Sequence, residues 1–346
     1  MSKRKKKPSK ASDLKVGVLF NLPAQPLRGE KIDYLAETEV AEQAEALQEA
    51  LRKLGFRSQL FPLGDDIQPL IAELRMNKPD VVVNLCEGAF GDSHQEMNAP
   101  SLLELLGIPY TGSSPLSLGL CQNKGLTKDI LRANGIPTPR YQVLESFDDW
   151  SGELRCPLFV KPLREDASIG ISSKSYVRND AELKTQVEYI RAQYRQAALV
   201  EEYIAGRELN VSILGNEKPE VLPISEIIFE WQEEPKIVDY AAKWLKESEE
   251  FKKTKPKCPT DLTESLKAEV EKIALKAYEA LCCRDYARVD MRLRHEEPFV
   301  LEVNPNPDIS HEAGFARSLR AAGIPYEEFV RRIVSFALGR GTQKQT

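Results

Sequence analysis

The sequence predicts an α/β protein whose first hundred residues form an open parallel sheet and whose remainder folds into smaller α+β units. Strand-like and helix-like stretches alternate along the first hundred residues, which is typical of parallel βαβ units. The 346 residues are enough for two or three compact domains. The hydrophobic fraction of 42% is that of an ordinary globular protein, and no apolar run approaches the roughly 18 residues of a membrane span.

The first unit begins with a predicted buried strand over residues 15–21. Apolar residues then recur at helical spacing until Gly55, namely Val40, Ala44, Leu47, Leu51 and Leu54. A strand at 56–61, a helix at 65–76 and a strand at 81–85 follow. Because ligands of parallel sheets bind beyond the carboxyl ends of the strands, we expect a binding loop over residues 84–91.

The pattern changes after Gly112. Helical stretches over residues 114–134 end at Gly135, and prolines follow them. The next elements are predicted as four strands and two helices: strands at 140–144, 157–161, 171–177 and 198–204, and helices at 181–194 and 262–281. Between these two helices, we interpret the charged segment 245–259 as a mobile loop.

The most informative pattern is a predicted hairpin with strands at 285–293 and 299–304 and a turn near His295. Strand alternation places Tyr286, Arg288, Asp290 and Arg292 on one face; in the second strand it sets Val300, Glu302 and Asn304 against Phe299, Leu301 and Val303. Antiparallel pairing brings Asp290 opposite Glu302 within about one residue of register. Two carboxylates and a carboxamide beside an arginine suit Mg²⁺, and a solvent-facing ion network is the alternative.

Two further strand ends carry residues that suit a nucleotide. Lys161 ends an apolar strand, where an ammonium group is well placed for a phosphate, and residues 164–170 form a short segment able to close over it. Glu201 and Glu208 are able to hold an adenine amino group and ribose hydroxyls, although exposed strand-end carboxylates are common. There is no P-loop and no Gly-x-Gly-x-x-Gly followed by an acid, so another architecture must hold any nucleotide.

The charge distribution disfavours nucleic acid as a partner. Residues 1–12 contribute +6 to a formal net charge of -5, which leaves -11 for the rest of the chain. An acidic body repels a phosphate backbone, so we interpret the tail as disordered and solubilising, with an anchor for an acidic partner as the alternative. No apolar segment follows the N-terminal charges, and the six cysteines lack metal-type spacing. We therefore expect a cytoplasmic protein with no membrane partner.

A series of short motifs runs through the chain. They are Asn84-Leu-Cys-Glu-Gly-Ala-Phe-Gly-Asp92, Leu103-Glu-Leu-Leu-Gly-Ile-Pro-Tyr-Thr-Gly112, Asn123-Lys124, Gly135-Ile-Pro-Thr-Pro139, Val160-Lys-Pro162, Arg288-Val-Asp290 and Leu301-Glu-Val-Asn304. In type and order they resemble the D-alanine–D-alanine ligases, which belong to the ATP-grasp superfamily of carboxylate–amine ligases. The resemblance implies a three-domain ATP-grasp fold, with ATP held between the central and C-terminal domains. The expected units are the tail 1–12 and domains 13–112, 113–205 and 206–339.

The resemblance implies a role for each matching residue. Lys124, Lys161 and Lys243 would contact the ATP phosphates, Glu201 the adenine and Glu208 the ribose, with Glu202 and Ile204 in the same nucleotide-binding set. Asp290, Glu302 and Asn304 would bind two Mg²⁺ or Mn²⁺. Arg288, Lys243 and the flap residue Ser168 would be catalytic. In the family chemistry a carboxylate attacks the γ-phosphate to give an acyl phosphate, and an amine then displaces phosphate to form an amide. A homodimer is also implied.

The departures from the family pattern lie mostly on the amino-acid side. Glu87-Gly88 replaces His-Gly, the flap reads Glu165-Asp166-Ala167-Ser168 instead of Glu-Gly-Ser-Ser, and Trp244 replaces a tyrosine whose hydroxyl helps to hold the loops. Asp308 stands where the family has glycine, and Ala313 stands at a substrate-binding serine. We name Glu87, Asp92 and Asp308 as candidate substrate residues. The alternative is that Glu87 and Asp308 pair with Arg292, Arg294 or Arg317.

Three functions follow as hypotheses. The first is an ATP- and Mg²⁺-dependent ligase that joins a small acid to an amine, with specificity shifted toward a cationic acceptor. The second is a genuine D-alanine–D-alanine ligase of cell-wall synthesis, which the missing serines disfavour. The third is an ATP-binding regulatory module without turnover, which the intact Asp290, Glu302 and Arg288 disfavour.

Overall fold

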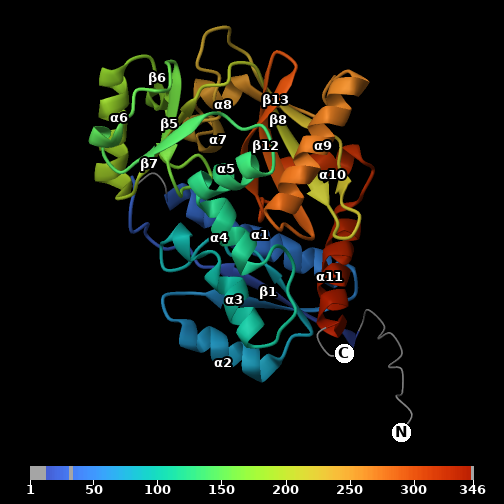
Figure 1. The fold of residues 1–346 in the computed structure, drawn as a ribbon. Helices are drawn as coiled ribbons and strands as arrows, with labels where there is room; N and C mark the ends of the chain where they lie inside the picture. The colour runs from blue at the N-terminus through green and yellow to red at the C-terminus, as the bar shows by residue number, and fades with distance from the viewer. Residues whose placement is uncertain (1–12, 31–33, 344–346) are drawn as a thin grey trace.

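The computed structural model describes residues 13–30 and 34–343 and arranges them around three sheets (Figure 1). The predicted basic tail, residues 1–12, lies outside the described residues. The first sheet lies at the bottom of Figure 1 and the other two lie above it. The last helix, α11 (Tyr326–Gln343), runs back onto the first sheet, where Ile333 shares a core with Val16 of β1 and Val81 of β3.

The first sheet is parallel, as predicted, with strand order β2-β1-β3. Its strands are β1 (Lys15–Asn21), β2 (Arg57–Leu63) and β3 (Val81–Asn84), and its helices are α1 (Tyr34–Lys53), α2 (Ile67–Asn77) and α3 (Asn98–Leu105). β3 is buried at every residue, because helices cover the sheet. The predicted binding loop leaves the carboxyl end of β3.

The second sheet is antiparallel and small. It has the order β4-β7-β5-β6, from β4 (Tyr141–Leu144), β7 (Ala198–Glu202), β5 (Leu158–Pro162) and β6 (Tyr176–Val177), and α6 (Asp180–Tyr194) packs on it. The helical stretches predicted over 114–134 are α4 (Pro115–Gln122) and α5 (Lys124–Ala133), and the Asn123 side chain accepts the Leu126 N–H and caps α5. The predicted strand over 171–177 is wrong for most of its length: Ser172 caps a 3₁₀ turn at Ser173–Ser175.

The third sheet has the order β11-β10-β8-β12-β13, with β9 paired to β8. Its strands are β8 (Arg207–Leu214), β9 (Glu220–Val221), β10 (Ser225–Phe229), β11 (Thr254–Lys257), β12 (Tyr286–Arg294) and β13 (Glu297–Asn304), and its helices are α7 (Tyr240–Trp244), α8 (Glu249–Lys253), α9 (Glu264–Ala280) and α10 (Gly314–Ala321). The prediction of a mobile loop over 245–259 is wrong. Ser248 caps α8, and β11 pairs with β10.

The hairpin of β12 and β13 confirms the predicted pairing of Asp290 with Glu302. The register shifts between Asp290 and Met291, so Met291 pairs with Val300 and Leu301 is the extra residue of a bulge. Val300 and Val303 therefore both point into the core, and the simple alternation predicted for this strand is wrong. The bulge lies next to the Asp290–Glu302 pair without breaking it, so these two carboxylates still face each other across the hairpin.

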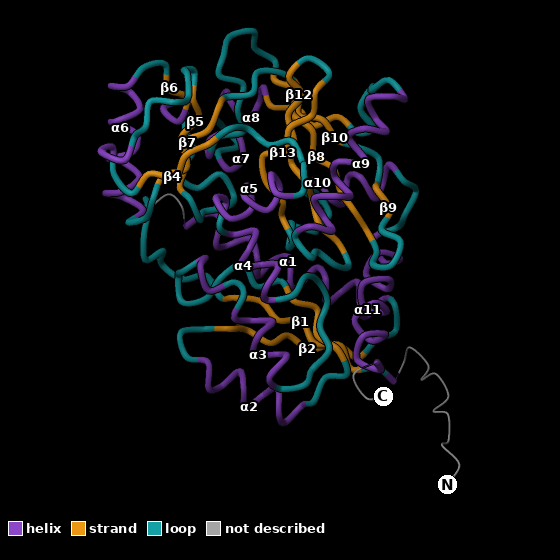
Figure 2. Tube along the Cα trace, viewed as in Figure 1, coloured by secondary structure: helices purple, strands orange, loops and turns teal. Residues whose placement is uncertain are grey.

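Figure 2 shows the second and third sheets side by side, with α5 between them and in contact with β13. The residues assigned to nucleotide binding come from both sheets, from the connection between β7 and β8, and from α5 and α7. In the described part of the chain no helix is both long and apolar enough to cross a membrane.

Candidate active site

Two buried lysines and one buried glutamate form the centre of the site. Lys161 Nζ, at the end of β5, lies 2.9 Å from Glu201 Oε1 on β7, and Lys128 Nζ on α5 lies 2.6 Å from Glu201 Oε2. Burial works against the charge of Glu201, but the two ammonium groups outweigh it and hold the pKa of Glu201 below its usual value. Glu201, expected beside the adenine, is therefore first of all the counterion that fixes Lys161.

Lys128 was not predicted from the sequence. It is fully buried, it also donates to Thr138 Oγ1 at 2.9 Å, and burial lowers its pKa. The sequence contains one indication of its position, because Lys128 follows Lys124 by four residues and so shares its face of α5. Lysines at this spacing are usually solvated, and only the packing of α5 against the third sheet shows that these two are buried.

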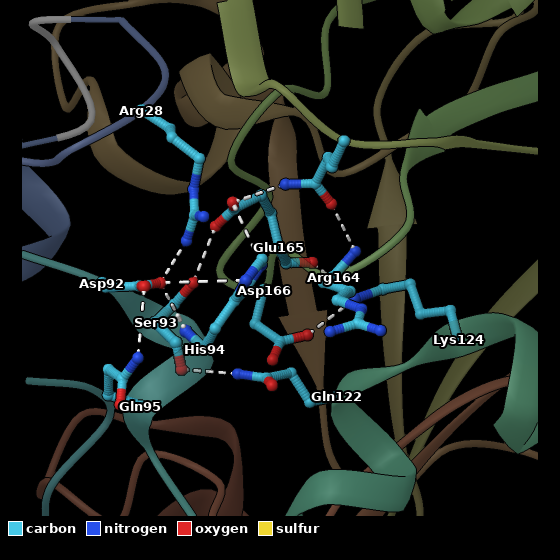
Figure 3. Close-up of polar contacts among 11 residues, drawn as sticks. Arg28, Asp92, Ser93, His94, Gln95, Gln122, Lys124, Arg164, Glu165 and Asp166 are labelled. Atoms are coloured by element: carbon cyan, nitrogen blue, oxygen red, sulfur yellow. Dashed lines mark hydrogen bonds and ion pairs between the residues drawn. The ribbon is translucent and has the colours of Figure 1, made fainter. Parts of the chain in front are cut away.

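The predicted phosphate flap, residues 165–168, lies against Lys124 (Figure 3). Lys124 Nζ donates to the backbone carbonyl of Glu165 and lies 2.8 Å from Asp166 Oδ1. Burial disfavours the charge of Lys124, but Asp166 and Glu302 outweigh it and raise the pKa. Asp166 stands where the family has glycine, so in this chain the flap itself supplies a counterion for a lysine expected to bind phosphate.

The flap is held on one side by the loop that leaves the first sheet. The Glu165 carboxylate lies between two donors: Ser93 Oγ, seen in Figure 3, lies 3.0 Å from Oε2, and Gln196 Nε2 lies 2.8 Å from Oε1. Asp92 caps the turn Ser93–Gln95 by accepting the His94 N–H at 2.9 Å, and it pairs with Arg28. Asp92, a predicted substrate residue, thus lies in the framework that joins this loop to the flap.

On its other side the flap is held by the segment that carries Lys243. Ser168 Oγ donates to the Val238 carbonyl at 2.8 Å, and Trp244 Nε1 donates to the Ala167 carbonyl at 2.9 Å. Ala167 and Ser168 both have positive φ, at 56° and 62°, which is costly for residues with a Cβ and needs such support. The expectation that Trp244 removes a contact between these loops is therefore corrected, because its indole N–H supplies one.

Asp290 is the most densely bonded residue of the predicted metal set. Arg288 donates to it through both arms, from Nε to Oδ1 and from Nη2 to Oδ2, each at 2.7 Å. Asn210 adds a bond to Oδ1 at 2.7 Å and Asn304 one to Oδ2 at 2.9 Å. These four donors use all four acceptor positions of the carboxylate. Asp290 is therefore free to bind a cation only when Arg288 turns away from it.

Glu302 differs from Asp290 because its neighbours are cations at longer range. Burial on its own would raise the pKa of Glu302, but Lys124, Lys161 and Arg288, with a hydrogen bond from Asn304, lower it to about 2. The carboxylate is ionised at any physiological pH. In kind, the set of Glu302, Asn304 and Asp290 fits Mg²⁺, which takes one or two carboxylates and completes its shell with water and phosphate oxygens. The described residues contain no cluster of three or more His, Cys, Asp or Glu that would form a closed protein cage for a metal.

The predicted ribose and adenine residues meet at the junction of the two upper sheets. Glu208, at the start of β8, accepts two bonds from Arg292 on β12, and Arg292 Nη1 also donates to the Ile204 carbonyl at 3.0 Å. The Glu202 side chain points elsewhere, toward the exposed Arg140, with Oε1 3.8 Å from Nη1. If Glu202 contacts a nucleotide, it must do so through its backbone.

Lys243 lies among charges from three segments. Removal from water, and then the positive charge of Arg288, lower its pKa, while Glu87, Asp308 and Glu302 oppose this change. Because the side chain is still solvent-exposed, we expect the lowering to be modest. Glu87, Asp308 and Glu302 thus act on the charge of the ammonium group, and two of them are predicted substrate acids.

The three arginines named as alternative partners of Glu87 and Asp308 make other contacts in the structure, and Asp308 interacts electrostatically with Arg288 instead. Arg292 bonds Glu208, Arg294 stacks on Phe299 with its guanidinium carbon 4.5 Å from the ring centre, and Arg317 donates to the Glu312 carbonyl. Asp308 Oδ1 accepts the Ser310 N–H at 2.8 Å, while Ala313 begins α10 without a side-chain cap.

Glu96 is a carboxyl group near the site that was not predicted. Its Oε1 accepts a bond from Asn306 Nδ2 at 3.0 Å, and the same amide donates to the Cys86 carbonyl. Burial, then Asp166 and Glu87, raise the pKa of Glu96 to about 8, against the opposing effects of Asn306 and Lys124. No spacing pattern in the sequence identifies Glu96, because its acidic neighbours come from the flap and from the loop after β3.

The fold and these side chains define an ATP-grasp protein of the carboxylate–amine ligase class. Residues 130–335 match the family model described as D-ala D-ala ligase C-terminus. The D-alanine–D-alanine ligase of Nitrosospira multiformis is 33% identical over 307 residues, which cover 87% of this chain and 93% of that protein. The uncharacterized protein y4sG of Sinorhizobium fredii is 38% identical over 258 residues, 74% of each chain. The crystal structure of the Bacillus anthracis D-alanine–D-alanine ligase complexed with ATP has a TM-score of 0.75 at 26% identity and covers 96% of this chain and 99% of its own. The chain belongs to the D-alanine–D-alanine ligase family.

Proposed function

We propose that this protein is an ATP-dependent ligase that joins the carboxyl group of a small acid to an amine, with release of ADP and phosphate. The observation that carries the proposal is the convergence of Lys124, Lys161 and Arg288 on an ionised Glu302. Fixed cations around a carboxylate at a sheet junction suit the developing charge of phosphoryl transfer, which is catalysed mainly by positioning and charge stabilisation. The names of the family relatives support the same reaction class.

Each residue of the site would have a role in the reaction that follows from its position. Lys124 and Lys161 would hold the phosphates, with Lys161 fixed by Glu201 and Lys128, and the flap would exclude water between Ser93 and Trp244. Glu302 and Asn304, joined by Asp290, would hold two Mg²⁺ (or Mn²⁺), which supply charge neutralisation to the phosphates when bound. Arg288 would leave Asp290 to meet the developing negative charge, and Lys243 would meet it from the side of α7.

The bonds of the reaction balance without a further reactant. The acid's carboxylate oxygen attacks the γ-phosphorus, and the bond between this phosphorus and the ADP oxygen breaks. The amine nitrogen then attacks the acyl carbon, the carbon–oxygen bond to phosphate breaks, and the amine releases a proton. A nucleophilic amine must be uncharged at the attacking nitrogen, so a second, charged nitrogen would be the part that acidic side chains recognise.

For the acceptor we propose a molecule with such a second positive charge, such as a diamine or a basic amino acid. Glu87 and Asp308 both act on the charge of Lys243, so two acids from different segments lie near one predicted catalytic lysine. Ala313 offers no hydroxyl to a substrate carboxylate. An acidic region favours a cationic ligand over the carboxylate of a second amino acid.

A genuine D-alanine–D-alanine ligase is the second candidate, because several relatives carry that name. A non-catalytic ATP-binding module is the third, and the ionised Glu302 among three cations disfavours it. The cytoplasmic location and the homodimer remain part of the proposal.

The test is phosphate release from ATP and MgCl₂ by the full chain, with each of a panel of amino acids, diamines and polyamines, and with the product mass determined. We expect release that requires both an acid and an amine, and a product whose mass is their sum less one water. ATP binding without stimulation by any pair would contradict the ligase proposal. Efficient turnover with D-alanine alone would support the second candidate instead.

A further inference from the structure

Arg292 is a buried arginine on β12 whose side chain is only 4% exposed. Its Nε and Nη2 donate to Glu208 Oε2 at 3.1 and 2.7 Å, and its Nη1 donates to the Ile204 carbonyl at 3.0 Å. Nη2 also donates to the Lys236 carbonyl. The guanidinium carbon lies 5.1 Å from the centre of the Tyr203 ring. The side chain is therefore held at one position by three different segments.

The contacts on Glu208 are asymmetric. Both bonds from Arg292 go to Oε2, and Oε1 accepts no hydrogen bond from any residue that the structure describes. Burial raises the pKa of Glu208, Asp290 and Glu302 add to the rise, and Arg292 opposes it. Arg292 thus both orients the carboxylate and favours its ionised form, while one oxygen stays available to a ligand.

The same arginine fixes the backbone around Glu208. Ile204 lies in the connection between β7 and β8, and Lys236 lies in the segment before α7, so one guanidinium joins the two walls beside Glu208. A lysine could not reproduce this arrangement, because only the planar fork of arginine donates along several fixed directions at once.

We propose that Arg292 is a positioning residue for the nucleotide, which holds Glu208 so that its free oxygen accepts a ribose hydroxyl. The inference rests on the proposed function, because it takes Glu208 as part of the nucleotide site. It predicts that recognition of the ribose, and not only binding in general, depends on Arg292. A buried ion pair that merely stabilises the sheet would instead affect every nucleotide equally.

The test compares ADP with 2′-deoxy-ADP and with 3′-deoxy-ADP, each with MgCl₂, by isothermal titration calorimetry on the full chain. We expect the wild type to bind ADP about tenfold more tightly than one of the two deoxy analogues, as for loss of a hydrogen bond to a charged group. Arg292→Gln should weaken ADP binding about tenfold and reduce the discrimination to less than twofold. Glu208→Gln should reduce the discrimination in the same way.

Arg294→Gln is the matched control, because Arg294 lies two residues further along β12 and contacts Phe299 instead of Glu208. It should keep the tenfold discrimination. Arg292→Lys replaces Arg292→Gln if the latter does not fold, as judged by circular dichroism and the melting temperature, and the same collapse of discrimination is expected.

Three outcomes would overturn the inference: a folded Arg292 variant that keeps full discrimination, one that loses affinity for all three ligands by the same factor, or a wild type that does not discriminate. A wild type that binds no nucleotide would overturn the proposed function itself and the inference with it.

Discussion

Glu302 and Glu96 are two carboxyl groups withdrawn from water on the two sides of the same site, and their pKa values are shifted in opposite directions. The pKa of Glu302 is lowered to about 2 and that of Glu96 is raised to about 8. Burial favours the neutral form of both. The difference comes from their neighbours, because Glu302 faces Lys124, Lys161 and Arg288, whereas Glu96 faces Asp166 and Glu87.

The comparison shows how one acidic chain builds two environments. The nucleotide side gathers its cations from α5, β5 and β12, and each is fixed by a carboxylate, as Lys161 is by Glu201. The proposed substrate side gathers its acids, Glu87, Glu96 and Asp308, from the loop after β3 and from the segment after β13. Under the proposed function, the first arrangement suits phosphate and divalent cations, and the second suits a positively charged acceptor.

The change that should break the nucleotide side most severely is Glu302→Gln. It removes the ionised carboxylate around which the cations converge, and we expect ATP-dependent turnover to fall about a thousandfold, or about 4 kcal/mol. Steady-state ADP release measures this loss. Glu297→Gln, at the exposed start of the same strand, should turn over like the wild type, and near-normal activity in Glu302→Gln would sink the assignment.

Glu201→Gln tests how much the buried ion pairs of the nucleotide side contribute to the stability of the fold. It leaves Lys128 and Lys161 buried without their shared counterion, so we expect the free energy of unfolding to fall by about 3 kcal/mol. Urea denaturation measures the change. Glu202→Gln, whose side chain faces the exposed Arg140, should lose less than about 0.5 kcal/mol, and equal losses in the two variants would argue against the buried pair.

Glu96→Gln tests the acidic side through pH. The pKa of Glu96 is about 8 in the folded protein, against an ordinary value of 4.5. Between these values the folded state retains a proton that the unfolded state has lost, so its contribution to stability falls as the pH rises from about 4.5 to about 8. Glutamine keeps the bond from Asn306 and removes this loss.

We therefore expect Glu96→Gln to be more stable than the wild type by about 1–2 kcal/mol at pH 8.5 and equal to it at pH 4.5. The expected gain is smaller than the pKa shift alone would give, because the Glu96 side chain is only half-buried. Urea denaturation at both pH values measures the difference. Glu45→Gln, on the exposed face of α1, should show no such pH dependence. A gain that is the same at both pH values would show that the pKa of Glu96 is not raised in the folded protein.

The smallest expected effect is that of Asp308→Asn. Asp308 is partly exposed, so its attraction for a cationic acceptor is screened, and we expect the KM for a diamine acceptor to rise about threefold with the KM for ATP unchanged. Initial rates at varied acceptor concentration measure the change. Asp261→Asn, at an exposed acid that pairs with Arg207, should leave the KM for the diamine unchanged, and a rise in the KM for ATP alone in Asp308→Asn would move Asp308 to the nucleotide side.

The two sides also differ in how far they follow from the sequence. Strand alternation and a turn near His295 were enough to predict that Asp290 pairs with Glu302, because both residues lie within one hairpin. The bulge at Leu301 was not predictable, since it depends on how Val300 and Val303 fill the core. The pairing of β11 with β10 was not predicted, because the charged residues of this edge strand are also typical of a loop.

Residues whose partners come from distant segments of the chain were also not predicted, because the sequence pattern does not show which segments pack together. Lys128 is buried only because α5 packs between two sheets, and the pKa of Glu96 is raised first by burial and then by Asp166, which the flap brings near it. Arg292 was placed on the correct strand face, but its bond to the Ile204 carbonyl depends on the path of the chain between β7 and β8. Local patterns predict which residues share a face, and tertiary packing decides what they meet.

The most direct test of the central claim is a competition for the acyl group at equal concentrations of D-alanine and 1,4-diaminobutane, with D-alanine as the acid and with ATP and MgCl₂ present. The masses of the two products give the partition. We predict that the wild type forms mostly the diamine amide and that the double variant Glu87→Gln, Asp308→Asn shifts the partition toward D-alanyl-D-alanine. A wild type that forms mostly D-alanyl-D-alanine would contradict the account of the acidic side.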